Sequence, residues 1–339
     1  MNSPRDSWRP TATRALLEQR ASLLGRARRF FAARGVLEVD TPIVVNSAVT
    51  DVHIHSARVH LADASDSQAP DANRPYFLHT SPEYAMKRML AAGSGDIFQI
   101  CHVVRGLERG RLHNAEFTLI EWYRIGLSLD ELMSEVEALV RELLGSHGAR
   151  RAGERISYRA AFVRELGLDP FTAPLSELRR AARPLGFTTV SAAASSDGEP
   201  QRDELLELLM GALVGPRLGR GALTFVHGYP ATQAALARLD PHEPGTALRF
   251  ELYCEGLELA NGFHELASAT EQRARFECDI EERRRRGLPL LPIDERLLAA
   301  LEAGLPECTG VALGFDRTLM LASGARHIEE VLAFPTARA

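Results

Sequence analysis

The sequence predicts an α+β protein, in which antiparallel strands form a sheet and helices lie outside it. Two observations favour this class. Strand-like segments come in neighbouring pairs instead of alternating one by one with helices, and residues 96–125 have the pattern of one long hairpin. The chain has 339 residues, enough for one large domain or two ordinary ones. Because no clear linker or repeat divides it, we expect a single domain over residues 1–339.

Composition limits the class of protein further. Hydrophobic residues make up 45% of the chain and charged residues 25%, which is typical of a folded globular domain. The net charge of -5 gives no overall basic balance of the kind that general nucleic-acid binding needs. No apolar run reaches the roughly 18 residues of a membrane helix. The N-terminus also lacks the apolar core of a signal peptide, so we expect a cytoplasmic protein without membrane contact.

The first half of the chain alternates between helical and strand periods. Apolar positions at helical spacing end near Gly35, and with the residues before them they form an N-terminal extension and helix over residues 1–33. Ser81 followed by Pro82 is typical of a helix start, with the serine as N-cap. The expected elements are a helix over 13–34, a strand over 36–39, a helix over 82–92, and strands over 96–104 and 115–125.

The second half contains a long segment without recognisable chemistry. Residues 146–222 read as mostly short helices separated by glycine and proline, so we expect a helical insertion there. The charged run Arg283 to Arg286 favours a solvated helix face, with a contact to an acidic partner as the alternative. The other expected elements are a helix over 129–144, strands over 223–226 and 248–259, a helix over 271–286, a strand over 310–313 and a helix around Arg317.

Lysine is almost absent from the chain. Lys87 is the only lysine, and Met86 and Arg88 flank it. A phosphate-binding loop of the GxxxxGK[ST] type is therefore excluded. Any chemistry on ATP has to use arginine as its cation.

Four segments carry the strongest functional signal. They are RGVLEVDTP at 34–42, FQICHVVRGLERGRLHNAEFTLIEWYR at 98–124, ELANGFHEL at 258–266 and GVALGFDR at 310–317. The first, second and fourth resemble motifs 1, 2 and 3 of class II aminoacyl-tRNA synthetases. With the third, the set is most similar to the lysine-type catalytic core. The resemblance covers about residue 14 to the end and implies a class II catalytic domain that acts as a homodimer.

The resemblance implies an ATP site built on arginine. Activation of a carboxylate by ATP passes through a crowded anionic state, which preformed cations stabilise. Arg105 would clamp the carboxylate and the α-phosphate with its planar fork, and Arg317 would hold the γ-phosphate and cover the adenine. These two are the expected catalytic residues. The implied ATP-binding set is Arg105, Glu108, His113, Asn114, Phe117, Glu251, Glu258 and Arg317.

The same resemblance implies magnesium and a cationic amino acid. Glu251 and Glu258 lie seven positions apart, so a strand bulge would let both reach one Mg²⁺ between the phosphates. Carboxylates gathered around a small pocket are costly unless a cation compensates them, which fits a lysine-like substrate. The implied substrate-binding set is Glu83, Glu121, Tyr123, Ala260, Asn261 and Glu265.

The acceptor is inferred from what precedes motif 1. Lysyl-tRNA synthetases carry an anticodon-binding β-barrel there, and the roughly 33 residues in this chain are too few for one. In this respect the chain resembles the elongation factor P (R)-β-lysine ligase family, which implies β-lysine or lysine as substrate and elongation factor P as acceptor, with tRNA binding not expected. Two alternatives stay open. One is a truncated lysyl-type synthetase that uses α-lysine with tRNA or a small molecule, and the other is an inactive regulatory paralogue.

Two departures from the synthetase pattern bear on these hypotheses. Leu107 stands where motif 2 usually has glutamate, which puts part of the adenine contact in doubt and is the best support for an inactive paralogue. Ala260 stands where lysine-type synthetases usually have glycine. Its methyl group would crowd an α-amino group and favour a β-amino acid, although one methyl discriminates by only ~1–3 kcal/mol.

Overall fold

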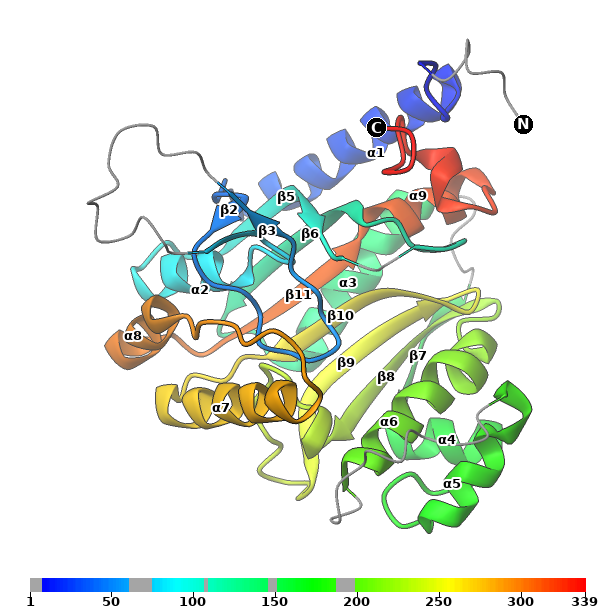
Figure 1. Cartoon of the computed structure of the whole chain (residues 1–339). Coiled ribbons are helices and arrows are strands. Elements are labelled where there is room, and N and C mark those ends of the chain that lie inside the picture. Colours follow the sequence, from blue (N-terminus) through cyan, green and yellow to red (C-terminus); the bar gives the residue numbers. More distant parts are fainter. Residues whose placement is uncertain (1–7, 61–74, 107–108, 146–150, 187–198) are drawn as a thin grey trace. The chain divides into compact units, whose positions relative to one another are not determined.

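The computed structural model describes two compact units of the chain (Figure 1). The described residues are 8–60, 75–106, 109–145, 151–186 and 199–339. The first unit comprises Met1–Leu127, Leu139–His147 and Leu266–Ala339, and the second comprises Ser128–Ala138 and Gly148–Glu265. Each unit has strands and helices of its own.

The strands of the first unit include the predicted hairpin. β5 (Ile97–Val104) and β6 (Glu116–Ile125) pair antiparallel, from Val104 opposite Glu116 to Ile97 opposite Tyr123. β11 (Cys308–Gly314) adds to β6 antiparallel, and the short edge strand β1 (Leu37–Glu38) pairs parallel with β5. A separate three-stranded sheet has the order β2-β4-β3, with bounds Val44–Val45, Tyr76–Leu78 and Arg58–Val59.

The first helix forms as the apolar spacing predicted. α1 (Arg14–Ala32) is capped by Thr13, whose hydroxyl accepts a hydrogen bond from the Leu16 amide at 3.3 Å. Leu23, Ala27, Phe30 and Phe31 form its buried stripe. The Phe31 ring stacks on Phe98 of β5 with centroids 4.3 Å apart, which fixes the helix against the sheet.

The remaining helices of the first unit differ from the prediction at their starts. α2 (Glu83–Ala91) begins one residue later than expected, with Pro82 at the N-cap, and the Ser81 hydroxyl instead accepts from the Glu83 amide at 3.0 Å. α8 (Glu295–Gly304) was not predicted, although Asp294 caps it by accepting from the amides of Arg296 and Leu297. The other helices are α7 (Ala269–Arg285), α9 (Phe315–Ser323), the 3-10 turn η7 (Ile328–Val331) and the end of α3 (Leu129–Leu144).

The positive charges of the arginine run at the end of α7 have more partners within the protein than the sequence indicated. Arg283 is only 3% exposed, and its guanidinium donates to the carbonyls of Pro289 and Asp51 at 2.9 Å each. The three arginines that follow pair with acidic side chains one turn earlier, namely Glu281 and Glu282. The prediction of a solvated face is wrong for Arg283, and the local ion pairs neutralise the charge that an acidic partner would contact.

The second unit contains strands in the order β10-β9-β8-β7. Their bounds are Leu257–His264, Thr246–Cys254, Ala222–Pro230 and Arg151–Ser157. The single strand expected over 248–259 is wrong, because the chain reverses at Glu255 and Gly256, whose φ angles of 50° and 76° are those of a tight hairpin turn. β7 was not predicted and pairs parallel with β8.

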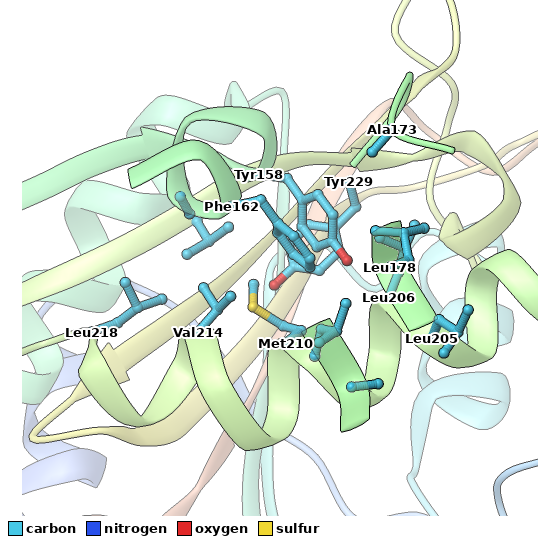
Figure 2. Packing of buried hydrophobic residues seen from close by; sticks show 14 of the residues in the cluster. Tyr158, Phe162, Ala173, Leu178, Leu205, Leu206, Met210, Val214, Leu218 and Tyr229 are labelled. Carbon is cyan, nitrogen blue, oxygen red and sulfur yellow. The ribbon is translucent and has the colours of Figure 1, made fainter. Parts of the chain in front are cut away.

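The helices of the second unit enclose an apolar cluster (Figure 2). Tyr158 and Phe162 of α4 lie against Tyr229 of β8, and the Tyr158 ring is 4.7 Å from each of the other two. These helices are α4 (Tyr158–Leu166), α5 (Leu175–Ala182), α6 (Glu199–Leu209) and the short turns η3 (Arg183–Leu185), η4 (Met210–Val214), η5 (Gly215–Arg217) and η6 (Ala231–Gln233). The helical character expected for 146–222 thus applies to the described residues after β7. Across the described chain, no helix combines the length and apolar character needed to cross a membrane.

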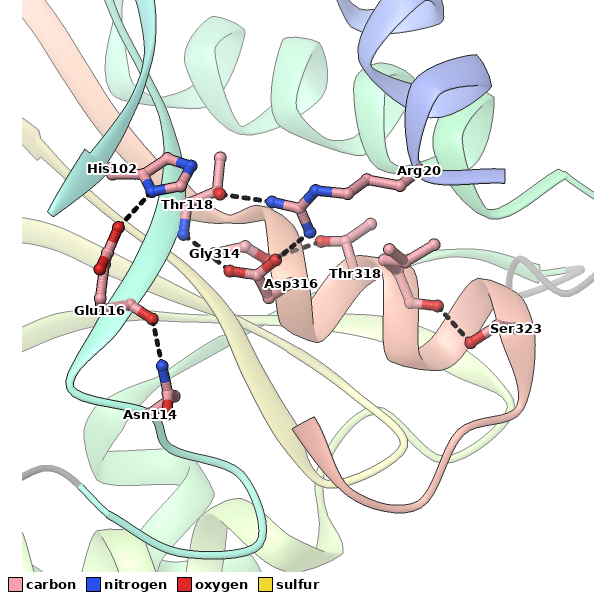
Figure 3. Close-up of polar contacts among 10 residues, drawn as sticks. Arg20, His102, Asn114, Glu116, Thr118, Gly314, Asp316, Thr318 and Ser323 are labelled. Carbon is pink, nitrogen blue, oxygen red and sulfur yellow. Dashed lines mark hydrogen bonds and ion pairs between the residues drawn. The ribbon is translucent and has the colours of Figure 1, made fainter. Parts of the chain in front are cut away.

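One buried carboxylate joins several elements of the first unit (Figure 3). Asp316 of α9 is 1% exposed, and it accepts from the Arg20 guanidinium of α1 at 2.5 Å and from the Thr118 amide of β6 at 2.7 Å. Arg20 also donates to the Thr118 hydroxyl at 2.5 Å. The charge on Asp316 is therefore paired, and it fixes α9 against both α1 and β6.

We predict that Asp316→Ala destabilises the protein by about 3–5 kcal/mol, because it leaves the Arg20 guanidinium without its buried counter-charge. Urea unfolding followed by circular dichroism measures the change. The matched control is Glu329→Ala, which removes an exposed carboxylate nearby in sequence and should change stability by less than about 0.5 kcal/mol. Equal unfolding midpoints for the two variants would contradict the assigned role of Asp316.

Candidate active site

The β5–β6 hairpin carries most of the predicted site residues of the first unit. Arg105 directly follows β5, and His113 and Asn114 lie in the turn before β6. Phe117, Glu121 and Tyr123 lie on β6 at alternate positions, so their side chains point to the same face of the strand. A single supersecondary element therefore positions groups that the sequence assigned both to ATP and to the amino acid.

Arg105 and Phe117 lie side by side. The Arg105 guanidinium carbon is 5.2 Å from the centre of the Phe117 ring, and the Arg105 Nε donates to the Thr80 carbonyl at 3.3 Å. Contact with the ring face stabilises the cation and limits its rotamers. The pair has the composition of a site for a planar anionic ligand, since a fork of donors stands next to an aromatic ring.

Arg317 and His113 also meet. The Arg317 Nη2 is 2.7 Å from His113 Nε2, and the Arg317 Nε lies 3.4 Å from the Leu112 carbonyl. Because a guanidinium can only donate, His113 Nε2 is the acceptor in this contact. Arg317 stands in the first turn of α9, so the arginine of motif 3 is held against the turn of motif 2.

Asn114, a predicted ATP-binding residue, contacts backbone groups in this structure. It is 8% exposed, and its amide nitrogen donates to the Glu116 carbonyl at 2.6 Å (Figure 3). Its oxygen accepts from the Thr336 amide at 3.1 Å. Both ends of the side chain hold backbone, so Asn114 shapes the turn and ties the C-terminal segment to it. Glu108 and the neighbouring Leu107 lie outside the described residues.

Glu121 is the most deeply buried of the predicted substrate carboxylates. It is 2% exposed, and it accepts from the Tyr123 hydroxyl at 2.8 Å and from the Ser81 hydroxyl at 2.7 Å. Ser81 in turn accepts from the Glu83 amide at 3.0 Å. The three predicted residues Glu83, Glu121 and Tyr123 are thus brought together, and Ser81, which the sequence assigned only to a helix cap, connects them.

The sequence analysis missed Lys87 as part of this group. Its ammonium is 2.6 Å from a carboxylate oxygen of Glu83 one turn earlier on α2, and Lys87 is 1% exposed. The i,i+4 spacing of Glu83 and Lys87 was a visible signal, since such pairs meet on one helix face. Its apolar neighbours Met86 and Leu90 also pointed to burial.

Burial and charge raise the pKa of Glu121. Desolvation is the largest cause and the Glu83 carboxylate the second, so the pKa rises from its usual 4.5 to about 7. Hydrogen bonds from Ser81 and Tyr123 and the Lys87 charge act in the opposite direction. Near neutral pH the pocket therefore holds a carboxyl group that can lose its proton when a cation arrives.

In the second unit, a buried arginine organises the predicted residues. Arg249 donates to the Asn261 side-chain oxygen at 3.1 Å and to Glu251 at 2.6 Å, and the Tyr253 hydroxyl donates to the other Glu251 oxygen at 2.6 Å. Asn261 and Glu251 are direct partners across β10 and β9, which explains why one guanidinium reaches both. The contact to its oxygen orients the Asn261 amide, so that its NH₂ group points to the other side.

These contacts bear on the expected magnesium site. The expected bulge within a single strand between Glu251 and Glu258 is wrong, because the two glutamates lie on neighbouring strands, β9 and β10, and the register shifts between Glu258 and Ala260. Glu251 is already neutralised by Arg249, and each of its oxygens accepts a short hydrogen bond. A carboxylate oxygen has a second lone pair, so these donors orient Glu251 without excluding it as a ligand of a divalent ion. Within the described residues, no group of three or more His, Cys, Asp or Glu side chains is arranged to hold a metal.

Ala260 and Glu265 are both buried, at 1% and 4% exposure. Ala260 is opposite Leu252 in the ladder, one position away from the Asn261–Glu251 pair. Because side chains alternate along a strand, its methyl group points to the face opposite Asn261. This geometry gives no support to crowding of a substrate amino group by Ala260. Glu265 directly follows β10 and forms an isolated bridge with Ala237.

The motif 2 hairpin, the motif 3 arginine and the buried carboxylates together define the catalytic domain of a class II aminoacyl-tRNA synthetase. The sequence pattern of the family described as tRNA synthetases class II (D, K and N) matches residues 5–338. The chain therefore belongs to this family, as the resemblance predicted.

Individual relatives are more specific. The chain is 47% identical over 333 residues to the elongation factor P–(R)-β-lysine ligase of Klebsiella pneumoniae strain 342, with 98% of each chain covered. It is 46% identical over 332 residues to the ligase of the same name from Vibrio cholerae serotype O1, again with 98% of each chain covered. The namesake from Edwardsiella ictaluri is 47% identical, with the same coverage.

We predict that Glu121 makes the stability of the protein fall as pH rises between about 4.5 and 7. The folded state keeps the Glu121 proton up to a pKa of about 7, whereas the unfolded state releases it near 4.5. The stabilising contribution is therefore complete below the lower value and is lost as pH passes the higher one. Glu121→Gln removes this titration, so it should gain stability relative to the wild type over that range, by up to about 3 kcal/mol.

Urea unfolding at pH 5, 6, 7 and 8 measures this difference. Glu142→Gln, which changes an exposed carboxylate on α3, is the control and should run parallel to the wild type. A constant difference between Glu121→Gln and the wild type at all four pH values would show that Glu121 titrates in its usual range.

Proposed function

We propose that this protein is an ATP-dependent ligase that activates (R)-β-lysine as an adenylate and transfers it to the ε-amine of a lysine on translation elongation factor P. The observation that carries the proposal is the end-to-end match, at 46–47% identity, to relatives that bear this name. The buried carboxylates of the first unit support a substrate with an additional ammonium group. The two alternatives, a truncated synthetase that charges tRNA and an inactive paralogue, are not favoured by these matches.

Adenylate formation would use the two arginines of the first unit. The substrate carboxylate attacks the α-phosphorus of ATP, the bond from that phosphorus to the bridging oxygen breaks, and pyrophosphate leaves. Negative charge gathers between the carboxylate and the phosphate as they meet, and Arg105 is the proposed cation there. Arg317, held by His113 at 2.7 Å, is proposed to bind the γ-phosphate end, with Phe117 as the partner of the adenine ring. Magnesium is proposed as a companion of ATP, and no step is assigned to Glu251 or Glu258 as its ligand.

The amino acid would be bound by its charged groups. We assign its additional ammonium to Glu121, Glu83 and the Tyr123 hydroxyl, with Glu265 as a further carboxylate. Asn261 is proposed to donate its NH₂ group to the substrate carboxylate, since its side-chain oxygen already accepts from Arg249. These polar contacts set the position of the reacting carboxylate.

Transfer to the acceptor needs no covalent intermediate on the enzyme. The neutral ε-amine of the acceptor lysine attacks the carbonyl carbon of the adenylate, the bond to the phosphate oxygen breaks, and AMP leaves. The amine loses a proton as the amide forms. Charge stabilisation by the arginines and orientation of the adenylate are the contributions that we assign to the enzyme in this step.

A homodimer is proposed from the likeness of residues 34–42 to motif 1. The edge strand β1 lies within this segment, and its Leu37 side chain is 56% exposed. An exposed leucine on a strand with one free edge is typical of a surface that pairs with a partner. Native mass spectrometry of the sample used below also measures the oligomeric state.

We predict that the purified enzyme, given ATP, magnesium, (R)-β-lysine, elongation factor P and bulk tRNA, adds one β-lysyl group to elongation factor P and none to tRNA. Intact protein mass and acid-precipitable label on the tRNA are measured in the same reaction. Label on tRNA alone would support the truncated synthetase. The absence of product on both acceptors, together with no amino-acid-dependent ATP–pyrophosphate exchange, would support the inactive paralogue.

We also predict that Arg105→Met lowers the rate of β-lysine-dependent ATP–pyrophosphate exchange by about 100-fold to 1,000-fold, the effect of removing one donor to a developing anion. Arg109→Met removes an exposed cation from the same turn and is the matched control. It should keep a rate within about threefold of the wild type. A similar loss in both variants would mean that the general charge of the turn, and not the position of Arg105, supports activation.

A further inference from the structure

Lys87 is a buried cation beside the proposed amino-acid pocket. It is 1% exposed, and its ammonium lies 2.6 Å from Glu83, itself a proposed ligand of the substrate ammonium. A lysine in this place competes for the carboxylate that the substrate would use. Burying an ammonium is costly, so a position that keeps one has to gain from the pairing.

We propose that Lys87 is a positioning residue of the amino-acid pocket, which holds Glu83 in an ion pair so that Glu121 is the carboxylate that receives the substrate ammonium. This inference rests on the proposed function and gives the two glutamates different roles. The negative charge of Glu83 is neutralised by Lys87, and its side chain shapes the pocket. The negative charge of Glu121 is neutralised by the ammonium group of the substrate.

The contacts of the two glutamates support this division. Glu83 has a full cation at 2.6 Å, whereas Glu121 accepts from the neutral hydroxyls of Ser81 and Tyr123 at 2.7 and 2.8 Å. Hydroxyl donors solvate a carboxylate without cancelling its charge. Binding of an ammonium group therefore stabilises the charge of Glu121 more than that of Glu83.

The groups facing Glu121 set the charge that a ligand meets. On α2 these are Glu83, which raises its pKa, and Lys87, which lowers it. Tyr123 lies on the same strand, and on β5 the Cys101 thiol has its pKa raised to about 12, mainly by burial and then by Glu121, so it stays neutral. With Glu83 and Lys87 cancelling, these groups of the first unit carry together at most about one net negative charge. They therefore fit a ligand that brings one ammonium to this end.

The test uses the pH dependence of kcat/KM for (R)-β-lysine in ATP–pyrophosphate exchange. Binding of an ammonium by Glu121 needs its ionised form, so kcat/KM should rise with pH to a plateau above about pH 7. Lys87→Met removes a charge that favours ionisation, and it should move this rise upward by about one pH unit or more. A shift of one pH unit lowers kcat/KM at pH 7 by about fivefold, and the loss recovers at higher pH.

Three further variants separate charge from shape. Lys87→Arg keeps the cation and should keep the rise near its wild-type position. Lys87→Met combined with Glu83→Gln removes both charges and should bring the rise back toward the wild-type pH. Arg88→Met removes the exposed cation next in sequence and should leave the profile unchanged.

The possible results are distinct. A folded Lys87→Met variant whose kcat/KM is reduced equally at every pH would overturn the proposal, because a merely structural lysine has that effect. If Lys87→Met does not fold, the variant that combines Lys87→Met with Glu83→Gln tests whether the charge or the shape of Lys87 is required. Its recovery of a folded protein supports charge compensation, and its failure to fold shows that the shape of Lys87 is what matters.

Failure of the proposed function has another signature. In that case the wild type shows no β-lysine-dependent exchange at any pH. The Lys87 charge effect on Glu121 is still measured without substrate, since Lys87→Met should move the pH-dependent fall in unfolding stability upward in the same way as the kinetic profile. A wild-type enzyme that is active, with neither profile moved in Lys87→Met, refutes the role of Lys87 alone.

Discussion

The cost of burying charge shapes both units of this protein. Several of the charged groups that the described chain buries have a partner within the same unit. Asp316 is held by Arg20, Glu83 by Lys87, Glu251 by Arg249, and Arg283 by backbone carbonyls. Removing one member of such a set leaves a desolvated charge, so these residues constrain one another strongly. Glu121 differs, because it accepts hydrogen bonds from two hydroxyl groups and its pKa is raised.

The sequence predicted those parts of the fold whose pattern is local. The spacing of Leu23, Ala27 and Phe31 indicated α1, and paired strand-like segments indicated the β5–β6 hairpin. β7 was missed because it is an edge strand, the last in its strand order. An edge strand can consist largely of polar residues, so it lacks the alternation of apolar and polar positions that indicates a strand in the sequence. The turn between β9 and β10 was missed because it places Glu255 at positive φ, where asparagine or aspartate is the usual signal.

A motif in the sequence indicates which residue types belong to the site, whereas their neighbours become visible only in the structure. Arg105 with Phe117 and Arg317 with His113 are brought together as expected. Asn114 serves the backbone instead, and Ala260 points away from Asn261, because strand register and turn geometry are three-dimensional properties. Lys87 was read only as the reason why a phosphate-binding lysine loop is excluded. Its role in the pocket depends on burial, which a single sequence does not give.

The isolation of Lys87 also concerns the product of the reaction. An acyl adenylate is a general acylating agent that reacts with any accessible neutral amine, including those of the protein that makes it. Here the one lysine of the sequence is 1% exposed and held as a cation at 2.6 Å from Glu83, and arginine side chains stay protonated. The enzyme thus offers almost no lysine nucleophile to its own intermediate. The near absence of lysine thus limits acylation of the enzyme by its own adenylate. The enzyme has to select its acceptor only among the amines of other molecules.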